Sequence, residues 1–194
     1  TVTLTITATD VNGVDALRFA NEDGAYGGAY GDWQSPVSTR TWVLESTDGL
    51  KTVWMQVRDV PGNVATVSDT ITLDQTPPAV AFAINEHAPY TLSPTVTLAI
   101  TATDLNGIGA MRFANEDGAY SDWQSPVATK TWLLSSALES TLVIDRKTVR
   151  VQVRDVPGNI TTVADRIILD LFPPWAQLCI NEGARYTKIP TVTL

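Results

Sequence analysis

Residues 1–10 read TVTLTITATD, the same pattern returns at residues 95–104 as TVTLAITATD, and it begins a third time at residues 191–194 as TVTL. Within the first copy, apolar side chains alternate with threonine, which is the period of a β-strand with one buried face. Threonine forms strands well on an exposed face. A segment that recurs every 94 to 96 residues indicates one structural unit repeated along the chain.

The repeat extends beyond this strand, because residues 1–26 and 95–120 are identical at 21 of 26 positions. Two later motifs also recur, WQSPV at 33–37 and 123–127, and QVRDVPGN at 56–63 and 152–159. The copies differ in length at two places, where residues 27–31 stand against Ser121 and residues 135–146 stand against 45–50. We expect both places to be surface loops, since loops tolerate insertions.

The rest of the chain also has the periodicity of strands, and no window shows a helical period. Alternating apolar runs cover residues 53–58, 70–73 and 79–84. Turn sequences such as Asn12-Gly13 and Pro61-Gly62-Asn63 separate the runs. About seven short strands in about 95 residues predict an all-β chain of tandem immunoglobulin-like β-sandwiches, with two repeats per chain.

Two proline pairs mark the predicted domain boundaries, Pro77-Pro78 and Pro173-Pro174, because such segments are stiff and pair poorly in sheets. We therefore predict three parts: repeat 1 at residues 1–76, lacking its own first strand; a complete repeat 2 at 77–172, starting with the strand 79–85; and a tail at 173–194.

The tail has the sequence of the first strands of another repeat, and two interpretations of it stay open. In the first, a long tandem array continues beyond this stretch. In the second, the tail adds as a strand to the incomplete first sandwich of a neighbouring subunit. Strand addition would cover an edge and a part of the core that repeat 1 otherwise exposes.

The composition and net charge of the chain favour some classes of function and argue against others. The chain has 194 residues, 44% hydrophobic, and a formal net charge of −8. An acidic chain suits cation binding and argues against nucleic acid, and no apolar run approaches the roughly 20 residues of a membrane span. The single cysteine, Cys179, excludes an intramolecular disulfide. We expect it in a buried strand as an inert small hydrophobe, with an intersubunit disulfide as the alternative.

The order of the motifs resembles the tandem bacterial Ig-like modules of large secreted and cell-surface proteins. The motifs are ITATD-x-NG, LRFANEDG or MRFANEDG, WQSPV, VQVRDVPGN and LD-x-x-PP, and they cover nearly the whole chain. The resemblance implies an extracellular or cell-surface structural role in an adhesin stalk, surface layer or fibre, with copies of the chain as partners. The copies depart from each other at Cys179, where the other has Ala83, and at Arg150, where the other has Trp54.

Acidic and amide residues gather at one predicted pole of the sandwich. In an immunoglobulin-type sandwich, the loop after the second strand and the loop between the last two strands share a pole, where the preceding linker also arrives. The residues expected there in repeat 2 are Asp74, Asp104, Asn106, Asp155 and Asn159. Three carboxylates with amide oxygens form a set that Ca²⁺ binds. The equivalents in the flanking parts are Asp10, Asn12, Asp59, Asn63 and Asp170.

The competing interpretation is ordinary turn chemistry, because Asp-x-Asn-Gly and Asp-x-Pro-Gly-Asn are good turn sequences. Arg58 and Arg154 could also pair with the aspartates. Asn159-Ile160-Thr161 is an N-glycosylation sequon as well, and a glycan on Asn159 would compete with its role as a ligand. A second acidic stretch, Asn21–Gly24 with its copy at 115–118, is expected to form a hairpin turn, with a metal site as the alternative.

The tryptophans divide into two groups. We expect Trp42 and Trp132 in the core. The candidates for an interface with other subunits are Trp33, Trp54, Trp123, Trp175 and Cys179. Trp33 and Trp123 could instead stack on sugars, which makes a carbohydrate-binding or adhesive module, with glycans as partners, the alternative function. We expect no enzyme, since His87 is the single histidine and no acid–base pair or nucleophile stands out in both repeats.

Overall fold

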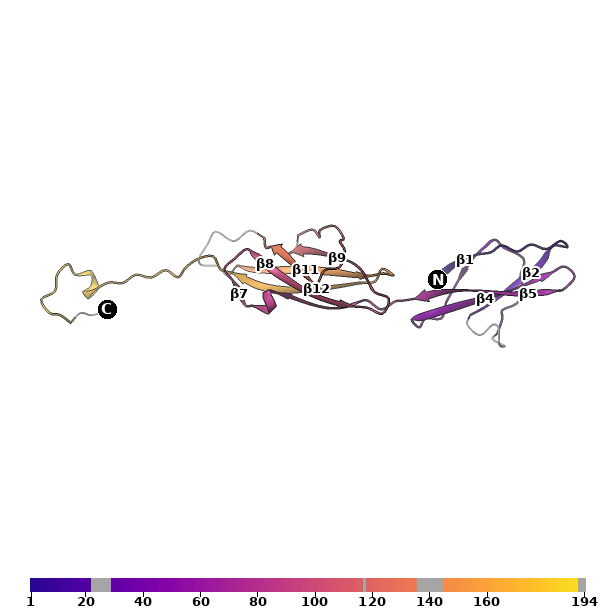
Figure 1. Cartoon of the computed structure of the whole chain (residues 1–194), viewed down its shortest axis with the longest axis horizontal. Coiled ribbons are helices and arrows are strands. Elements are labelled where there is room, and N and C mark those ends of the chain that lie inside the picture. The colour runs from indigo at the N-terminus through magenta and orange to yellow at the C-terminus, as the bar shows by residue number, and fades with distance from the viewer. Residues whose placement is uncertain (22–28, 117, 136–144, 192–194) are drawn as a thin grey trace. The chain divides into compact units, whose positions relative to one another are not determined.

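The computed structural model of the chain describes residues 1–21, 29–116, 118–135 and 145–191. The chain divides into two compact units, one of Thr1–Pro77 with Pro157–Asn159 and one of Pro78–Val156 with Ile160–Leu194. We call residues 1–77 the first domain, 78–172 the second domain and 173–191 the C-terminal segment. The described residues form strands and two short 3-10 turns, and none of their helices is long and apolar enough to cross a membrane (Figure 1).

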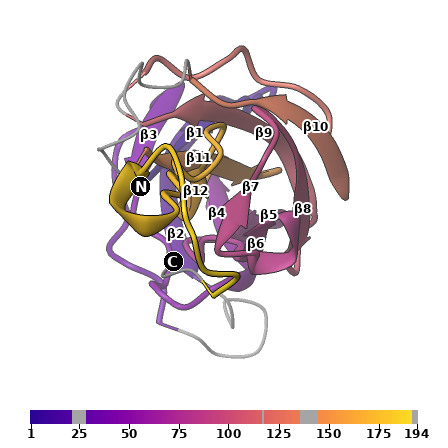
Figure 2. The ribbon, with the colours of Figure 1, turned by 90° about the vertical axis from the view of Figure 1, so that its left-hand side faces the viewer.

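The second domain is an immunoglobulin-like β-sandwich. One sheet has the order β10-β8-β6, formed by β6 (Ala79–Ile84), β8 (Thr95–Thr103) and β10 (Thr129–Leu133). The other has the order β7-β12-β11-β9, formed by β7 (Tyr90–Thr91), β9 (Ile108–Asn115), β11 (Arg146–Asp155) and β12 (Ile160–Leu169). In Figure 2 the strands β10, β8 and β6 follow one another along one side. This division of the strands between two sheets is that of the immunoglobulin fold.

The core of the second domain lies between these sheets. Strand β11 shows how the sequence builds it, because Val149, Val151 and Val153 are completely buried while the residues between them point outward. Phe113 and Leu98 meet them from the other strands and are equally buried. Each such side chain contributes about 1.5–3 kcal/mol relative to exposure, so the alternating pattern supplies the apolar face on which this sandwich closes.

The first domain has the same plan with fewer strands among its described residues. Strands β1 (Val2–Thr5) and β3 (Thr39–Trp42) form one sheet. Strands β2 (Val14–Asn21), β4 (Gly49–Asp59) and β5 (Val64–Leu73) form the other, in the order β2-β4-β5. These five strands correspond to β8, β10, β9, β11 and β12, and the described part of this domain has no counterpart of β6 or β7.

Two expectations about strands were wrong. Residues 1–9 were expected to form one strand, but β1 ends at Thr5, whereas its counterpart β8 continues to Thr103. Residues 175–181 were expected to be the first strand of another repeat, with Cys179 buried in it, yet they form no strand and Cys179 is exposed. The reason is the same in both cases, because a strand needs a neighbour, and β6 and β8 supply one to each other in the second domain. Residues 192–194 of the third TVTL lie outside the described part.

Candidate metal centre

The connection from β8 to β9 is a tight turn organised by Asp104. Its Oδ1 accepts a hydrogen bond from the backbone N–H of Asn106 at 2.8 Å, and its carbonyl accepts one from Gly107 at 3.3 Å. Gly107 has φ +88°, a conformation that glycine adopts without strain. The sequence Asp-Leu-Asn-Gly therefore fixes the Asp104 carboxylate at the mouth of this turn.

The turn from β11 to β12 begins at Asp155, a carboxylate residue that is only 1% exposed. A Cβ atom on Gly109 would lie 2.7 Å from the Asp155 carbonyl oxygen, so only glycine allows β9 to pass this close. The backbone N–H of Val156 donates to the carbonyl of Gly107 at 3.0 Å. These contacts hold the two loops of the second domain side by side.

Asp74 follows β5 directly, in the segment that leads into β6. Its Oδ1 accepts a hydrogen bond from the backbone N–H of Thr76 at 3.0 Å. Its carbonyl accepts one from Nδ2 of Asn159 at 3.2 Å. Asn159 thus uses its amide nitrogen to hold this segment, and a glycan on that nitrogen would have to replace the contact.

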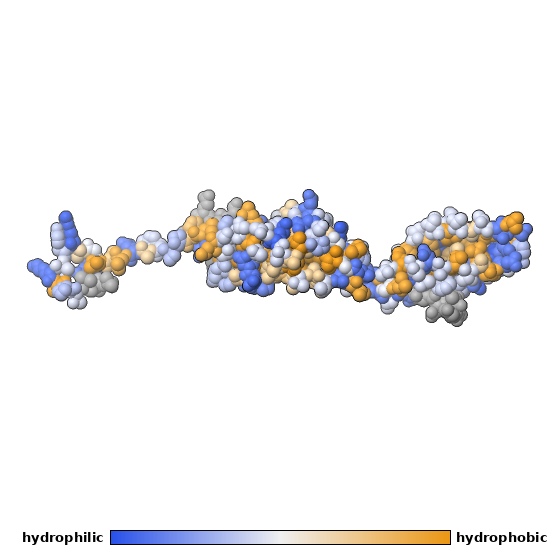
Figure 3. All heavy atoms as spheres, in the orientation of Figure 1, coloured by the Kyte–Doolittle hydropathy of each residue, from blue (hydrophilic) through white to orange (hydrophobic). Residues whose placement is uncertain are grey.

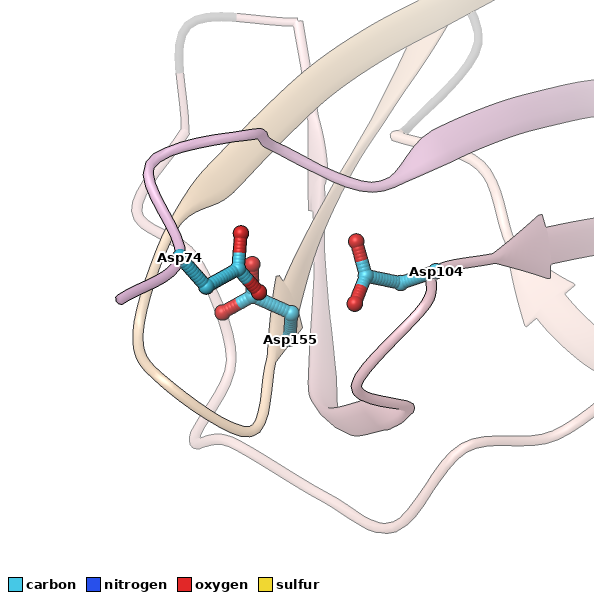
Figure 4. A group of neighbouring side chains, drawn as sticks. All are labelled: Asp74, Asp104 and Asp155. Atoms are coloured by element: carbon cyan, nitrogen blue, oxygen red, sulfur yellow. The ribbon is translucent and has the colours of Figure 1, made fainter. Parts of the chain in front are cut away.

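The carboxylates of Asp74, Asp104 and Asp155 form a cluster that we call the three-aspartate cluster. Each residue offers one oxygen, and these oxygens all lie within 4.8 Å of one another. Figure 4 shows the three carboxylates directed toward a common point. Two unit charges at this separation repel by about 3–4 kcal/mol in a dielectric typical of a protein surface. A divalent cation between the carboxylates would attract each of them and outweigh this repulsion.

The donor set is chemically selective. It contains oxygen ligands only, whereas zinc prefers nitrogen and sulfur. Ca²⁺ takes about 6–8 oxygen ligands, and these can include backbone carbonyls and water beside carboxylates. Within the described ranges, no second group of three or more acidic, histidine or cysteine side chains lies this close together.

The corresponding aspartates of the first domain accept hydrogen bonds within their own turns. Oδ1 of Asp10 accepts the backbone N–H of Asn12 at 2.7 Å. Asp59 accepts three hydrogen bonds, from the backbone N–H groups of Gly62 and Asn63 and from Nδ2 of Asn63, at 2.6–2.7 Å. These bonds, led by that of the Asn63 side chain, lower the pKa of Asp59 below its ordinary value.

Asp170, the predicted ligand at the other end of the second domain, also organises a turn. Its Oδ1 accepts the backbone N–H of Phe172 at 3.2 Å, which repeats the bond from Thr76 to Asp74. Turn chemistry is therefore present at every predicted aspartate whose hydrogen bonds are described above. At Asp10, Asp104 and Asp170 the turn bond engages Oδ1, whereas at Asp59 the turn engages both carboxylate oxygens. A turn bond on one oxygen is compatible with a ligand role for the same carboxylate.

The arginines suspected of neutralising the aspartates have other described contacts. Arg58 forms an ion pair with Asp15, with 2.6 Å between Nη2 and Oδ2. The second domain has Gly109 at the position of Asp15, and the guanidinium of Arg154 lies 4.7 Å from the centre of the Trp123 ring.

The tryptophans of the WQSPV motifs lie against arginines. The Trp33 ring has Arg18 at 4.4 Å and Arg58 at 4.7 Å from its centre. The Trp123 ring has Arg112 and Arg154 at the same two distances, 4.4 and 4.7 Å. Both tryptophans are half-buried, and the backbone of the next residue in each motif bonds to the adjacent strand. Each of these rings is therefore engaged by two guanidinium groups, and sugar stacking on them stays a prediction.

The other aromatic candidates differ in exposure. Trp42 and Trp132 pack on the cores, and their Nε1 atoms donate to Asn21 and Asn115 at 2.6 Å. Trp54 is half-buried, while Trp175 is 85% exposed. Residues 22–28 and 117 lie outside the described residues, and they include residues 22–24 of the second acidic stretch but only one residue of its copy. In the copy, the N–H of Gly118 donates to the carbonyl of Asn115 at 2.7 Å, as in a turn.

Two polar sites were not predicted from the sequence. Asp145 and Lys147 form a buried ion pair with 2.7 Å between Oδ1 and Nζ. Asp48 accepts a hydrogen bond from Oγ1 of Thr76 at 2.6 Å and further bonds from Gln75, and these bonds lower the pKa of Asp48. The Asp48 carboxylate thereby holds the last residues of the first domain.

Comparisons with known proteins give matches to solved structures only. No family model and no curated protein sequence matches it. One similar solved structure is that of the fibronectin(III)-like modules of Clostridium thermocellum CbhA, with 14% identity, 91% of this chain and 90% of that chain covered, and a TM-score of 0.47. Another is a tetra-tandem repeat in the extending region of a large adhesion protein, with 22% identity and a TM-score of 0.34. That alignment covers 87% of this chain and 45% of the other. The immunoglobulin-like assignment rests on the strand order described above.

Proposed function

We propose that this chain is a non-enzymatic structural repeat of an extracellular filament, stalk or surface layer, rigidified by Ca²⁺. The observation that supports the metal is the three-aspartate cluster, in which oxygens of Asp74, Asp104 and Asp155 lie within 4.8 Å. The observation that supports the structural role is the repetition of one sandwich along the chain, with motifs that match at 21 of 26 positions in the first stretch alone.

The mechanism follows from where the three ligands sit in the chain. Asp104 and Asp155 belong to loops of the second domain, whereas Asp74 belongs to the segment that joins the first domain to it. An ion bound by all three ties this segment to the loops. Pro77 and Pro78 already restrict the backbone of the joint, so little freedom remains once the ion binds. The domains then act as rigid modules in series.

The proposed location fits the chemistry of such a site. A site with three carboxylates on loops resembles extracellular Ca²⁺ modules, which bind with dissociation constants of about 10⁻⁴–10⁻³ M. A site of that affinity is filled only where Ca²⁺ is abundant. Copies of the same chain are the proposed partners, because repeats of this kind act in series.

The test is the thermal unfolding of the chain in excess EDTA, in millimolar Ca²⁺ and in Mg²⁺. Ca²⁺ at about ten times its dissociation constant adds about 1.4 kcal/mol to the stability of the folded state. We expect the transition of the second domain to rise by roughly 10 °C in Ca²⁺, since 1 kcal/mol shifts a domain of this size by about 4–8 °C. Calorimetric titration is expected to give one Ca²⁺ per chain.

The matched variants are Asp104→Asn with Asp155→Asn for the cluster, and Asp10→Asn with Asp59→Asn for the same turns in the first domain. The first pair is expected to abolish the Ca²⁺ shift, and the second to leave it intact. Identical melts in EDTA and Ca²⁺ for the unmodified chain would reduce the aspartates to turn formers and remove the metal from the proposal.

A further inference from the structure

The outer face of the second domain's larger sheet carries a row of arginines separated by aromatic rings. In order along the row, the side chains are Arg150, Tyr120, Arg112, Trp123 and Arg154. Each guanidinium carbon lies 4.4–5.1 Å from the centre of the ring or rings beside it. Guanidinium groups are attracted to aromatic faces at such distances. We call these five residues the arginine ladder.

The position of the ladder follows from the alternation of β11. This strand buries its valines, so Arg150 and Arg154 point outward with Gln152 between them. Arg112 of β9 stands opposite Gln152, and its Nε donates to Oε1 of that residue at 2.8 Å. The Cα atoms of two residues that are four apart in a strand lie about 13 Å apart. The three guanidinium groups therefore stand in a line along β11.

None of these three arginines forms an ion pair with a residue that the structure describes. Arg112 donates to a neutral amide, and Nη2 of Arg150 donates to the carbonyl of Gly118 at 3.1 Å. For Arg154, the described contact is the one with the Trp123 ring. Figure 3 shows separate groups of strongly hydrophilic residues on the surface of the second domain, with apolar residues between them. Three positive charges thus stand in a row within a chain whose net charge is −8.

The first domain shows what an arginine in this setting binds. Arg58 is the counterpart of Arg154, and its guanidinium lies at the same 4.7 Å from the ring of Trp33. Its Nε and Nη2 both donate to Oδ2 of Asp15, at 2.8 and 2.6 Å. Asp15 lies at the irregularity in the pairing of β2 with β4, and Gly109 occupies that place in β9. The stacked arginine therefore binds a carboxylate in the first domain, whereas Gly109 offers none to Arg154.

The backbone excludes an internal carboxylate from this place in the second domain. A Cβ atom on Gly109 would lie 2.7 Å from the carbonyl oxygen of Asp155, so β9 cannot carry an aspartate here without a shift of the backbone. Arg154 is half-exposed. Its guanidinium can therefore bind a carboxylate that comes from another molecule.

We propose that the arginine ladder binds the carboxylates of a linear acidic polysaccharide built from uronic acid residues. Arg154 binds one carboxylate as Arg58 binds Asp15, and Arg112 and Arg150 bind further carboxylates of the same sugar chain. A linear polyanion fits because the three charges lie along one strand. The rings on either side hold the guanidinium groups in place, so little side-chain freedom is lost when the ligand binds.

The ladder suits a polysaccharide better than an acidic peptide. A peptide that adds to a sheet gains its affinity from hydrogen bonds with an unpaired strand edge. Strand β11 is paired on both sides, with β12 and with β9. The other edge of β9 bonds to the segment that follows it, through Met111 with Gln124 and Phe113 with Ser121. Within the described residues, the ladder therefore offers side chains and no free strand edge, which is sufficient for carboxylates on a sugar chain.

This inference goes beyond the proposed structural role, because it gives the chain a ligand other than copies of itself. It is also independent of the metal, since no residue of the ladder belongs to the three-aspartate cluster. Carboxylates of a polyuronate bind Ca²⁺ themselves, so every binding measurement is made in EDTA. The two proposals can then fail separately.

The first experiment titrates the chain with tetragalacturonate in EDTA at low salt, by calorimetry and by NMR of the arginine Nε–H groups. We expect one site per chain, with the largest shift at Arg154 and an affinity that falls as salt is added. Arg154→Gln is expected to weaken binding roughly fivefold, as for the loss of one exposed ion pair. It changes an outward side chain, so the variant is expected to keep its melting temperature.

The matched control is Arg58→Gln, the same substitution at the same place in the first domain, and it is expected to leave the affinity unchanged. A second variant, Asp15→Ala, removes the internal carboxylate from Arg58. It is expected to add a second, weaker site, because the first domain has Trp54 where the ladder has Arg150. The Nε–H signal of Arg58 should then shift on titration, which we do not expect in the unmodified chain.

Three results would overturn the proposal. One is the absence of binding to tetragalacturonate at low salt, and another is an unchanged affinity in Arg154→Gln. The third concerns ligands of the same length. Neutral tetragalactose is expected not to bind, and equal binding would assign the site to the rings. Tighter binding of tetraglutamate with blocked ends would assign the ladder to an acidic peptide.

Discussion

The two domains carry nearly the same sequence and bury it to different extents. Val149, Val151 and Val153 of β11 are completely buried, whereas Met55 and Val57, at the positions of the last two, are half-exposed in β4. The difference does not come from these residues, since the strands alternate in the same way. It comes from β6 and β7, which close the second sandwich. An alternating pattern thus determines which face of a strand can be buried, and the neighbouring strands determine whether it is.

The largest effect expected from this comparison concerns one pair of isoleucines. Ile167→Ala in β12 is expected to lower the free energy of unfolding of the second domain by about 2–5 kcal/mol, because it removes a buried side chain and leaves a cavity. Ile71→Ala, at the same position of β5, is expected to lower the free energy of unfolding of the first domain by well under 1 kcal/mol, because Ile71 is 47% exposed. Denaturant unfolding, monitored by hydrogen exchange of the backbone amides, measures the free energy of unfolding of each domain separately. Equal costs would mean that β5 is covered in solution.

A smaller effect is expected where the domains differ by one residue, Gly109 against Asp15. Gly109→Ala places a Cβ atom 2.7 Å from the Asp155 carbonyl oxygen. We expect the free energy of unfolding of the second domain to fall by about 1–3 kcal/mol, which is typical of an overpacked site. Asp15→Ala is expected to cost under 1 kcal/mol, since it removes an exposed ion pair.

The same Gly109 variant also tests the geometry of the metal centre. Displacing the backbone of Asp155 is expected to weaken Ca²⁺ binding in calorimetric titration, whereas Asp15→Ala should leave it unchanged. An undiminished affinity in Gly109→Ala would mean that the exact position of Asp155 is unimportant for the ion.

The smallest effect concerns acid stability and Asp59. Its pKa is lowered in the folded state by hydrogen bonds from Asn63 and Gly62. A lowered folded pKa stabilises the protein above the unfolded value of about 3.9, and the contribution is lost as pH falls through the folded pKa. Asn63→Ala is therefore expected to raise the Asp59 pKa, as followed by NMR titration, and to flatten the loss of first-domain stability below about pH 4. An unshifted titration would contradict the role of Asn63.

Much of the fold could be predicted from the sequence, because alternation and turn residues are local signals. The strands of the second domain and the inward positions of Phe82 and Ile84 follow directly from them. The grouping of Asp74, Asp104 and Asp155 also followed from the shared pole of an immunoglobulin-type sandwich, and ion binding there stays a prediction. The exposure of Cys179 was missed, because it depends on a neighbouring strand and not on the segment itself.

Other features of the site depend on contacts between residues distant in sequence. The close passage of Gly109 by Asp155, the stacking of Arg112 on Trp123 and the anchoring of Thr76 by Asp48 are of this kind. Each residue involved is common in many folds, so its type alone does not indicate which partner it contacts. Only the packed structure shows which of them meet.

The parallel pairing of β7 with β12 has a consequence for tension. Hydrogen bonds from Ile168 to Pro89 and from Asp170 to Thr91, at 3.1 and 3.0 Å, join a strand near the start of the second domain to its last strand. Traction on the two ends of that domain pulls these parallel strands in opposite directions along their length. The bonds are then sheared together and do not open one after another like a zipper. A module loaded in this way is suited to bear force along the chain.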